Sequence, residues 1–354
     1  MDNKLNVGVI GLGRLGSLYA EYLEYQISRS SVIAVTDVDD ERAQEIGDKL
    51  NIQHRFSDYR DMLELDELDA IVITTPTSTH KDIVIDATAA GMMIFCEKPL
   101  SINIDDAVTM REAIEKHGSF FHMGFMRRFD PGYTSAKEKI KNGEIGEPIV
   151  FKSTSRDPYR PSLEYADPAM SGGLFLDMGI HDFDLARWFM GEISELYSNA
   201  NVLAYPEMES INDVDNSITS LTFENGKIGS IDLSRSGIYG YDIRTEILGT
   251  EGTVQVGYLR ETPITVLKKN NVSHDTVPYF MERFEKAYVL QLRDFVDKAW
   301  EQKEPSLSIE DGVRALVAGH AATDSYKSGK PVSIDDSGME YSIKEQNQNL
   351  NVTN

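Results

Sequence analysis

The sequence predicts an α/β domain with a doubly wound parallel sheet, followed by an α+β domain with an open, mainly antiparallel sheet. Three observations lead to this fold class. Strand and helix patterns alternate up to about residue 123, strands joined by tight turns cover residues 214–268, and a chain of 354 residues is too long for one typical domain. We expect a first domain over 1–124, a second over 125–340 and a polar tail over 341–354.

Short apolar runs rich in β-branched residues alternate with helical patterns in the first domain. Strands are expected at residues 5–11, 31–37, 69–77, 92–99 and 119–125. Helices are expected between them, at residues 14–27, 39–51, 78–91 and 103–118. Strands that are apolar on both faces and separated by helices predict a parallel sheet covered on both sides.

The pattern changes after about residue 124. A helix at 131–142 ends at Gly143, and strands then follow one another. "NSITSLTFENGKIGSIDLSRS" alternates on both sides of Asn225-Gly226, a pair preferred in type I′ hairpin turns. A second hairpin is expected around Gly249 and Gly252. Two late helices, near 280–302 and 309–328, are free to pack back on the first domain, and the polar end after residue 343 is expected to fray.

Charge and cysteine content limit the class of protein. The net charge of −23 argues against nucleic acid or an anionic membrane as a partner. The single cysteine, Cys96, excludes an intrachain disulfide, indicates a reducing compartment and is expected to be an inert buried thiol. The sequence shows no signal-peptide pattern and no apolar run of the roughly 18 residues that a membrane span needs. We expect a soluble, cytoplasmic protein.

A glycine-rich turn in "VGVIGLGRLGSLYAEYL" predicts a dinucleotide site. Gly11, Gly13 and Gly16 have G-x-G-x-x-G spacing, with a strand before and a helix after them. Gly11 permits the tight turn, Gly13 lets a pyrophosphate approach the backbone, and Gly16 lets the helix pack on the strand. The helix N-terminus then binds the diphosphate. The intervening residues Leu12, Arg14 and Leu15 belong to the same predicted site.

The choice of cofactor depends on Asp37. This residue closes the next strand, about 20 residues after the glycines, where an acid accepts hydrogen bonds from ribose hydroxyls and repels a 2′-phosphate. Two further acids follow it, and Arg42 is too far along the helix to neutralise them. The sequence therefore predicts NAD rather than NADP.

Two other segments follow strands of the predicted parallel sheet. "TTPTSTH" offers Thr74, Thr75 and Pro76 to line the cofactor, with His80 either beside them or, in the reading we favour, capping the following helix. "EKP" places Glu97 and Lys98 at the crevice where such sheets bind ligands. Lys98 is either a surface lysine or a functional group at this crevice.

The stretch "GGLFLDMGIHDFDLARWFMG" reads as a buried helix that carries charge. Asp177 and His181 are four residues apart, and Asp184 follows on nearly the same side. The helix is too apolar for a solvated salt bridge, and no companion motif such as H-E-x-x-H supports a metal site. General acid–base chemistry, with the carboxylate orienting the imidazole, is the remaining interpretation.

Taken together, the glycine-rich turn, Asp37, "EKP" and D-x-x-x-H resemble the glucose–fructose oxidoreductase and inositol dehydrogenase superfamily over essentially the whole chain. "GFMRRFDPGY", "IGEPI", "YGYDIRTEILGTEG" and "DGVRALVAGHAATDSYKSGKPV" are most similar to its inositol 2-dehydrogenases. The resemblance implies an N-terminal Rossmann domain, a second domain on an open antiparallel sheet, and a homotetramer formed by sheet-to-sheet packing.

The resemblance also implies site residues. Lys98, Asp177 and His181 would be the catalytic group. The residues predicted near the NAD from their place after the strands are Thr75, Pro76, His80, Glu97 and Lys98. The implied polyol-binding residues, besides the catalytic group, are Arg127, Asp157, Asp184 and Tyr239. Asp157 stands where a myo-inositol enzyme is expected to carry a neutral amide, which favours scyllo-inositol beside myo-inositol as substrate.

The implied reaction oxidises one ring CH–OH of the inositol to a ketone, without a metal. His181 takes the hydroxyl proton, Asp177 fixes the imidazole, and Lys98, held by Glu97 or Asp177, stabilises the developing alkoxide. Two alternatives remain: a dehydrogenase of another sugar or polyol, such as glucose, and a non-catalytic NAD-binding sensor. An intact Lys98, Asp177 and His181 argues against the sensor.

Overall fold

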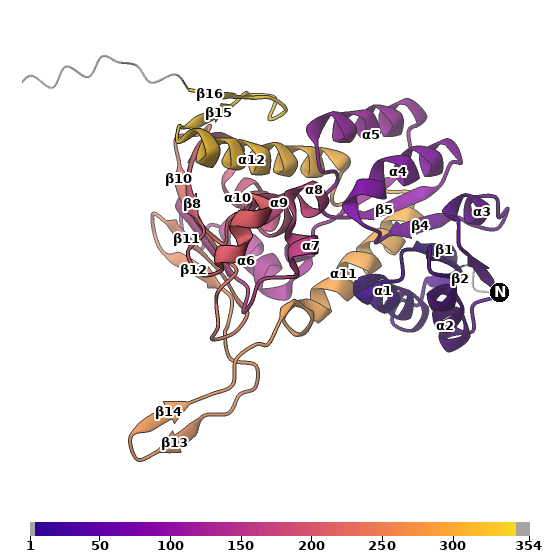
Figure 1. Ribbon diagram of the computed structural model, residues 1–354, viewed down its shortest axis with the longest axis horizontal. Helices are drawn as coiled ribbons and strands as arrows, with labels where there is room; N and C mark the ends of the chain where they lie inside the picture. Colours follow the sequence, from indigo (N-terminus) through magenta and orange to yellow (C-terminus); the bar gives the residue numbers. More distant parts are fainter. Residues whose placement is uncertain (1–3, 345–354) are drawn as a thin grey trace, which may run out of the picture. The chain divides into compact units, whose positions relative to one another are not determined.

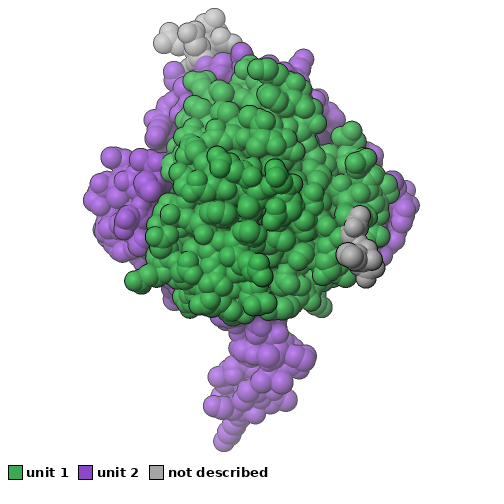
Figure 2. All heavy atoms as spheres, turned by 90° about the vertical axis from the view of Figure 1, so that its right-hand side faces the viewer, with its two compact units in different colours: residues 1–134, 284–316 green, residues 135–283, 317–354 purple. Residues whose placement is uncertain are grey.

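The computed structural model describes residues 4–344. The chain divides into two compact units: unit 1 comprises residues 1–134 and 284–316, and unit 2 comprises residues 135–283 and 317–354 (Figure 2). Three helices begin in one unit and end in the other, namely α6 (Pro131–Lys141), α11 (Phe280–Trp300) and α12 (Ile309–Ser328). Unit 1 thus contains the residues of the predicted first domain together with a late segment.

Unit 1 is built from alternating strands and helices (Figure 1). They are β1 (Leu5–Ile10), α1 (Arg14–Tyr25), β2 (Ser30–Thr36), α2 (Asp40–Leu50), β3 (His54–Phe56), α3 (Tyr59–Leu63), β4 (Ala70–Ile73), η1 (Thr77–Thr79), α4 (His80–Ala89), β5 (Met93–Glu97), α5 (Ile104–His117), β6 (Phe121–Gly124) and η2 (Met126–Phe129). The sheet order is β3-β2-β1-β4-β5-β6, and every neighbouring pair is parallel. This is the doubly wound order that the alternation predicts.

The central strands of this sheet are buried, because helices cover both of its faces. Helices α1 and α2 lie on one face and α4 and α5 on the other (Figure 1), and every residue of β4 is buried. β3 and α3 are not among the elements predicted from the sequence. None of the three residues of β3 is fully buried, because β3 is the edge strand, so it lacks the apolar run that reveals the central strands.

Unit 2 is built on an eight-stranded sheet. Its elements are β7 (Pro148–Arg156), α7 (Leu163–Ala166), α8 (Pro168–Ser171), α9 (Gly173–Asp177), α10 (Ile180–Met190), β8 (Ile193–Asn201), η3 (Pro206–Ile211), β9 (Asn216–Phe223), β10 (Ile228–Ser234), β11 (Asp242–Gly249), β12 (Thr253–Val256), β13 (Val266–Lys268), β14 (Asn271–Ser273), β15 (Val332–Ile334) and β16 (Tyr341–Ile343). The order in the sheet is β12-β11-β7-β10-β9-β8-β15-β16, and β13 pairs with β14 in a separate hairpin.

The sheet of unit 2 is mainly antiparallel, as predicted. Among the described residues β7 and β10 form its one parallel pair. Helix α10 contacts β7, and Ser325 of α12 accepts a hydrogen bond from the Ser198 amide of β8 at 3.0 Å, so these helices cover one face (Figure 1). Ile218, Ile228 and Leu248 are exposed on the same sheet.

The hairpin predicted at Asn225-Gly226 joins β9 to β10, but its turn is not type I′. Of the two residues only Gly226 has a positive φ, 79°, and its N–H donates to the Phe223 carbonyl at 2.9 Å. A type I turn closed by a left-handed glycine fits this geometry. The Asn225 backbone is not left-handed, as a type I′ turn would require, and its side chain donates to the Met190 carbonyl at 2.7 Å.

The other predicted features fall as follows. The hairpin around Gly249 and Gly252 joins β11 to β12, with the Gly249 N–H donating to the Gly252 carbonyl at 2.8 Å. The late helices are α11 and α12. In the predicted polar tail, 341–343 form β16, and residues 345–354 lie outside the described residues. No helix within 4–344 is both long enough and apolar enough to cross a membrane.

Candidate active site

The glycine-rich turn between β1 and α1 has the backbone that its sequence predicts. Gly11 has a φ of 87°, and a Cβ at Gly16 would lie 1.8 Å from the Gly11 carbonyl oxygen, so neither position accepts a side chain. A Cβ at Gly13 would meet no atom of the described residues within 4 Å. Packing within the protein therefore does not require Gly13, whereas a diphosphate bound at the N-terminus of α1, as predicted, would require it.

Asp37 lies beside this turn at the end of β2. Its Oδ2 accepts the Leu12 N–H at 2.6 Å, and its Oδ1 accepts the Asp39 N–H at 3.0 Å. Each carboxylate oxygen keeps a second acceptor site, which is what ribose hydroxyls need. The structure thus joins the predicted ribose-binding acid to the predicted phosphate-binding turn, where Leu12 is buried and Arg14 exposed.

His80 does not cap α4, so the reading that we favour from the sequence is wrong. The N-cap position belongs to Thr79, and the buried His80 ring lies between two carbonyl oxygens, with Nε2 3.0 Å from that of Thr75 and Nδ1 3.0 Å from that of Pro99. A neutral imidazole carries one N–H and donates to one of these two oxygens. Burial lowers the pKa of His80, so the neutral ring is favoured. The imidazole ties the loop after β4, which carries Pro76, to the loop after β5.

Glu97, at the end of β5, holds the backbone of Lys98. Glu97 Oε2 accepts the Lys98 N–H at 3.1 Å, and Oε1 accepts the hydroxyl of Tyr19 at 2.5 Å and Nε2 of Gln291 at 3.3 Å. Burial raises the pKa of Glu97, against the opposing effects of the Tyr19 hydrogen bond and the Lys98 charge. Glu97 therefore fixes the backbone of Lys98, and both of its carboxylate oxygens accept hydrogen bonds from residues of unit 1.

Two further predicted residues of unit 1 are buried. The Arg127 guanidinium lies 5.7 Å from the centre of the Phe284 ring and is 1% exposed. Cys96 is fully buried on β5, and burial raises the pKa of its thiol, as expected for a core cysteine. The polyol-binding role of Arg127 stays a prediction.

The stretch that carries Asp177 and His181 is not one helix. α9 ends at Asp177 and α10 begins at Ile180, so the two residues do not share a continuous helical face. Gly179 lies at the break, where a Cβ would come within 2.8 Å of both the Phe175 carbonyl oxygen and Leu233 Cδ1. The close approach of β10 therefore requires a glycine here, and the helix restarts beyond it.

Asp177 lies in a polar cluster that its sequence does not reveal. Asp177 Oδ1 accepts the Tyr165 hydroxyl at 3.2 Å, and Oδ2 pairs with Nη1 of Arg235 at 3.2 Å. The Arg235 side chain is fully buried at the end of β10. The negative charge of Asp177 and burial raise the pKa of Tyr165, so its hydroxyl remains a donor.

Asp213 and Asp157 complete the surroundings of Arg235. Both Asp213 oxygens accept the Leu174 N–H, at 3.2 and 3.1 Å, and so anchor the start of α9. Although burial lowers the pKa of Arg235, the nearby carboxylates of Asp177, Asp213 and Asp157 raise it. Of the predicted polyol-binding residues, the structure therefore brings Asp157 to the same cationic group as Asp177.

His181 and Asp184 lie together on α10, one turn apart, and both are buried. Their helix is fixed to β7 through Asp182, which accepts hydrogen bonds from the hydroxyls of Ser153 and Ser155, the latter at 2.9 Å. Tyr239 belongs to another network: its hydroxyl donates to Asp242 at 2.8 Å and accepts from Arg156 at 3.1 Å. The structure does not join Tyr239 to Arg235 by a hydrogen bond.

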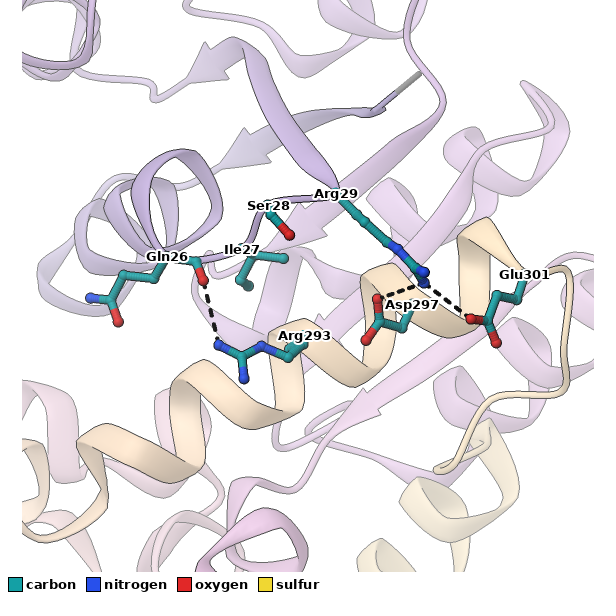
Figure 3. Close-up of a pocket in the computed structure, with 7 residues that line it drawn as sticks. All are labelled: Gln26, Ile27, Ser28, Arg29, Arg293, Asp297 and Glu301. Carbon is teal, nitrogen blue, oxygen red and sulfur yellow. Dashed lines mark hydrogen bonds and ion pairs between the residues drawn. The ribbon is translucent and has the colours of Figure 1, made fainter. Parts of the chain in front are cut away.

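A hollow of about 430 Å³ in unit 1 lies elsewhere, beside the start of β2 (Figure 3). Arg29 pairs there with Asp297 at 3.1 Å and Glu301 at 3.0 Å, and Arg293 donates to the Gln26 carbonyl at 3.4 Å. Ligands of doubly wound sheets bind at the carboxyl ends of the strands, and this hollow is at the opposite end. Its polar groups tie α11 to the α1–β2 connection.

Five residues around Asp177 and Glu97 were not predicted from the sequence, namely Arg235, Asp213, Tyr165, Tyr19 and Gln291. Only Arg235 leaves a signal in the sequence, because it is a charge directly after the buried alternation of β10. The other four become polar partners through contacts between residues that are distant in the chain. Within residues 4–344 no group of three or more His, Cys, Asp or Glu side chains is arranged to hold a metal ion.

Two family models match the chain. Residues 5–125 match the GFO/IDH/MocA model described as oxidoreductase family, NAD-binding Rossmann fold, and residues 137–334 match its C-terminal alpha/beta domain. The chain is 38% identical to the scyllo-inositol 2-dehydrogenase (NAD(+)) of Bacillus subtilis, over 95% of this chain and 98% of that protein. It is 37% identical to the myo-inositol 2-dehydrogenase of Thermotoga maritima, over 94% and 99%.

A solved structure extends the comparison. The crystal structure of scyllo-inositol dehydrogenase from Lactobacillus casei with bound NAD(H) and scyllo-inositol matches with a TM-score of 0.88 and 29% identity, over 94% of this chain and 99% of that chain. The predicted fold class, the NAD cofactor and the oxidoreductase class are confirmed. The chain belongs to the GFO/IDH/MocA oxidoreductase family, with an NAD-binding Rossmann domain and a C-terminal alpha/beta domain.

Proposed function

We propose that the protein is an NAD-dependent inositol 2-dehydrogenase, which oxidises a ring secondary alcohol of scyllo-inositol, myo-inositol or both to an inosose. The observation that carries the proposal is identity of 37–38% over nearly the whole chain to enzymes with these two activities. The chain also keeps Lys98, Asp177 and His181 in the pattern of the family. NAD, when bound, accepts the hydride from the carbinol carbon.

The residues of the chain supply placement and proton transfer. His181 takes the proton of the reacting hydroxyl, and Lys98 donates a hydrogen bond to the oxygen as negative charge develops on it. Asp177 supports the imidazolium that forms. Glu97 supports the assignment of Lys98, because it fixes the lysine backbone at the carboxyl end of β5.

Substrate preference is proposed to depend on Asp157. The Asp157 N–H donates to the Ser234 carbonyl at 2.8 Å, next to Arg235 in the chain. The charge of Asp157 helps to raise the pKa of Arg235 and, after burial, that of Tyr279. Tyr279 stacks on Tyr159, with ring centres 5.2 Å apart. An acidic acceptor beside aromatic rings suits a ring that presents several hydroxyl donors, and we expect scyllo-inositol to be a substrate beside myo-inositol. Arg127, Asp184 and Tyr239 are proposed as further polyol contacts.

A substrate panel tests the function. The purified protein is incubated with NAD or NADP and with scyllo-inositol, myo-inositol, glucose and other aldoses, and NAD(P)H absorbance is followed. We expect NAD-dependent turnover of an inositol at the highest kcat/KM. A higher kcat/KM on an aldose would make the protein a sugar dehydrogenase, equal efficiency with NADP would remove the role of Asp37, and NAD binding without any turnover would favour a sensor.

The finer assembly and compartment are also proposals. We propose a cytoplasmic homotetramer whose protomers pack through the sheet of unit 2, supported by the exposed Ile218, Ile228 and Leu248 on that sheet. Mass photometry of the wild-type protein is expected to give four protomers. Ile218→Asp is expected to dissociate them, whereas a monomeric wild type would contradict the assembly.

A further inference from the structure

Arg235 is a buried cation with too few hydrogen bonds for a purely structural arginine. Its side chain is fully buried, and Nη1 bonds only to Asp177, at 3.2 Å. Nε and Nη2 are buried and have no hydrogen-bond partner among residues 4–344. A buried guanidinium normally has most of its five donors satisfied, because an unsatisfied buried donor costs free energy.

Arg187 shows the structural arrangement in the same unit. Its side chain is 7% exposed and donates two hydrogen bonds to Glu192, from Nε to Oε2 at 2.7 Å and from Nη2 to Oε1 at 2.9 Å. Arg235 instead has one such bond, surrounded by the charges of Asp177, Asp213 and Asp157. The interaction of Arg235 with its neighbours is therefore mainly one of charge.

The backbone fixes both partners of the Asp177–Arg235 pair. The Arg235 N–H donates to the Asp215 carbonyl at 2.8 Å. Asp213 accepts the Leu174 N–H in the first turn of α9, the helix that ends at Asp177, and a Cβ at Gly173 would lie 2.8 Å from Asp213 Oδ1. The left-handed Gly173, with a φ of 74°, permits this contact. The carboxylate of Asp177 is thus held in place at the end of a short, anchored helix.

We propose that Arg235 is a positioning residue for the dehydrogenase reaction: it keeps Asp177 ionised and oriented, so that Asp177 supports His181 as proton acceptor. The inference rests on the proposed function. Tyr165 fixes the other carboxylate oxygen at 3.2 Å. Without the cation, three carboxylates would share a buried site, and Asp177 would take up a proton or turn away.

The pH dependence of turnover distinguishes this role from a structural one. The titratable groups of the cluster are Asp177, Tyr165, Asp157, Asp213 and Tyr279, together with His181 at the start of α10. Loss of the Arg235 charge favours the protonated form of both Asp177 and His181, and either change removes the proton acceptor. The acid limb of the kcat profile is therefore expected to move to higher pH.

The experiment compares Arg235→Met, Arg235→Lys and Arg187→Met with the wild type, using the inositol that the wild type turns over and saturating NAD. We expect Arg235→Met to lower kcat at least about tenfold and to shift the acid limb upward by about one pH unit, the usual scale for a charge partner. Arg235→Lys should restore the limb and much of kcat. The dissociation constant of NAD should stay within about twofold, because Arg235 lies outside the Rossmann domain.

The control separates chemistry from folding. Arg187→Met removes an arginine of similar burial from unit 2, and we expect a lower melting temperature without a shift of the acid limb. The inference is overturned if Arg235→Met has the kcat and the acid limb of the wild type. It is also overturned if Arg235→Lys has a kcat as low as that of Arg235→Met while its acid limb is not shifted. A wild type that turns over no inositol overturns the proposed function first, and this inference with it.

Discussion

At the scale of single residues, unit 2 holds several charges that a hydrophobic core would exclude. Asp177, His181, Asp184 and Arg235 are all largely buried, and each burial costs free energy unless a partner offsets it. The Asp177–Arg235 pair offsets two of these charges, and the Tyr165 hydroxyl adds a donor to the carboxylate. Such concentrations of buried ionisable groups are typical of functional sites.

Removal of the imidazole tests the proposed proton acceptor. We expect His181→Ala to lower kcat on the inositol substrate at least about a hundredfold, the usual loss when a general base is removed. NAD affinity should be unchanged, because the glycine-rich turn and Asp37 lie in unit 1. Steady-state kinetics and calorimetric titration with NAD measure both quantities. Near-wild-type turnover would remove His181 from the mechanism.

Tyr19 tests whether Glu97 positions Lys98. Tyr19→Phe removes only the hydroxyl that donates to Glu97, and we expect a loss of about 1–3 kcal/mol in stability together with a lower kcat. Tyr22→Phe is the matched control, because Tyr22 is also buried on α1 and no contact of its hydroxyl with Glu97 is found within residues 4–344. Urea unfolding and kinetics are measured on both variants. Equal kcat values would show that Lys98 does not depend on Tyr19.

At the scale of elements, the candidate site residues lie at short connections. The break at Gly179 separates α9 from α10, so Asp177 ends one helix while His181 lies in the first turn of the next. In unit 1, the His80 imidazole joins the loops after β4 and β5, which carry Thr75 and Lys98.

His80 predicts a pH dependence of stability. Its pKa in the folded state is below the value of about 6.5 of an unfolded histidine, so the unfolded state binds the proton more readily. The stability that the neutral ring contributes is therefore present above about pH 6.5 and decreases as the pH falls towards the folded-state pKa. We expect the melting temperature of the wild type to fall more steeply between pH 7.5 and 5.5 than that of His80→Gln. Equal slopes would contradict this assignment.

At the scale of the whole molecule, the candidate site residues are divided between two units that differ in sheet type. Unit 1 carries the cofactor turn on a parallel sheet, and unit 2 carries the Asp177–Arg235 cluster on a mainly antiparallel sheet. The net charge of −23 keeps the surface solvated and does not select an anionic partner. The neutral polyol of the proposed function is compatible with this charge.

NAD is expected to stabilise the protein through the turn at Gly13. At a concentration about 100 times its dissociation constant, NAD should raise the free energy of unfolding by about 2.7 kcal/mol, which thermal shift measures. Gly13→Ala should leave the NAD-free protein within about 1 kcal/mol of wild type, because its Cβ meets no atom of the described residues within 4 Å. The same Cβ should weaken NAD binding at least about tenfold.

The control for this prediction is Gly16→Ala. A Cβ there would lie 1.8 Å from a carbonyl oxygen, so we expect that variant to be destabilised without NAD. A Gly13→Ala protein that NAD stabilises as strongly as wild type would contradict the placement of the diphosphate.

The sequence by itself determined the features that depend on local pattern. Alternating apolar strands and helices determined the doubly wound sheet, because each strand and helix is encoded by a short run of residues. The glycine spacing with Asp37 is equally local, and it predicts the nucleotide site. The edge strand β3 was not predicted, because it lacks an apolar run. The turn type at Asn225 was predicted wrongly, because the Asn225 side chain binds the Met190 carbonyl, a contact between distant residues.

Only the tertiary structure decided the surroundings of the predicted side chains. Asp177 and His181 stand four residues apart in the sequence, yet α9 ends at Asp177 and α10 begins at Ile180. Gly179 between them lies so close to Leu233 of β10 that a Cβ would come within 2.8 Å of its Cδ1. The partners of Asp177 and Glu97 are Arg235, Tyr165, Tyr19 and Gln291, which come from other elements. Folding decides which distant donors meet a buried carboxylate, because that encounter depends on packing and not on local spacing.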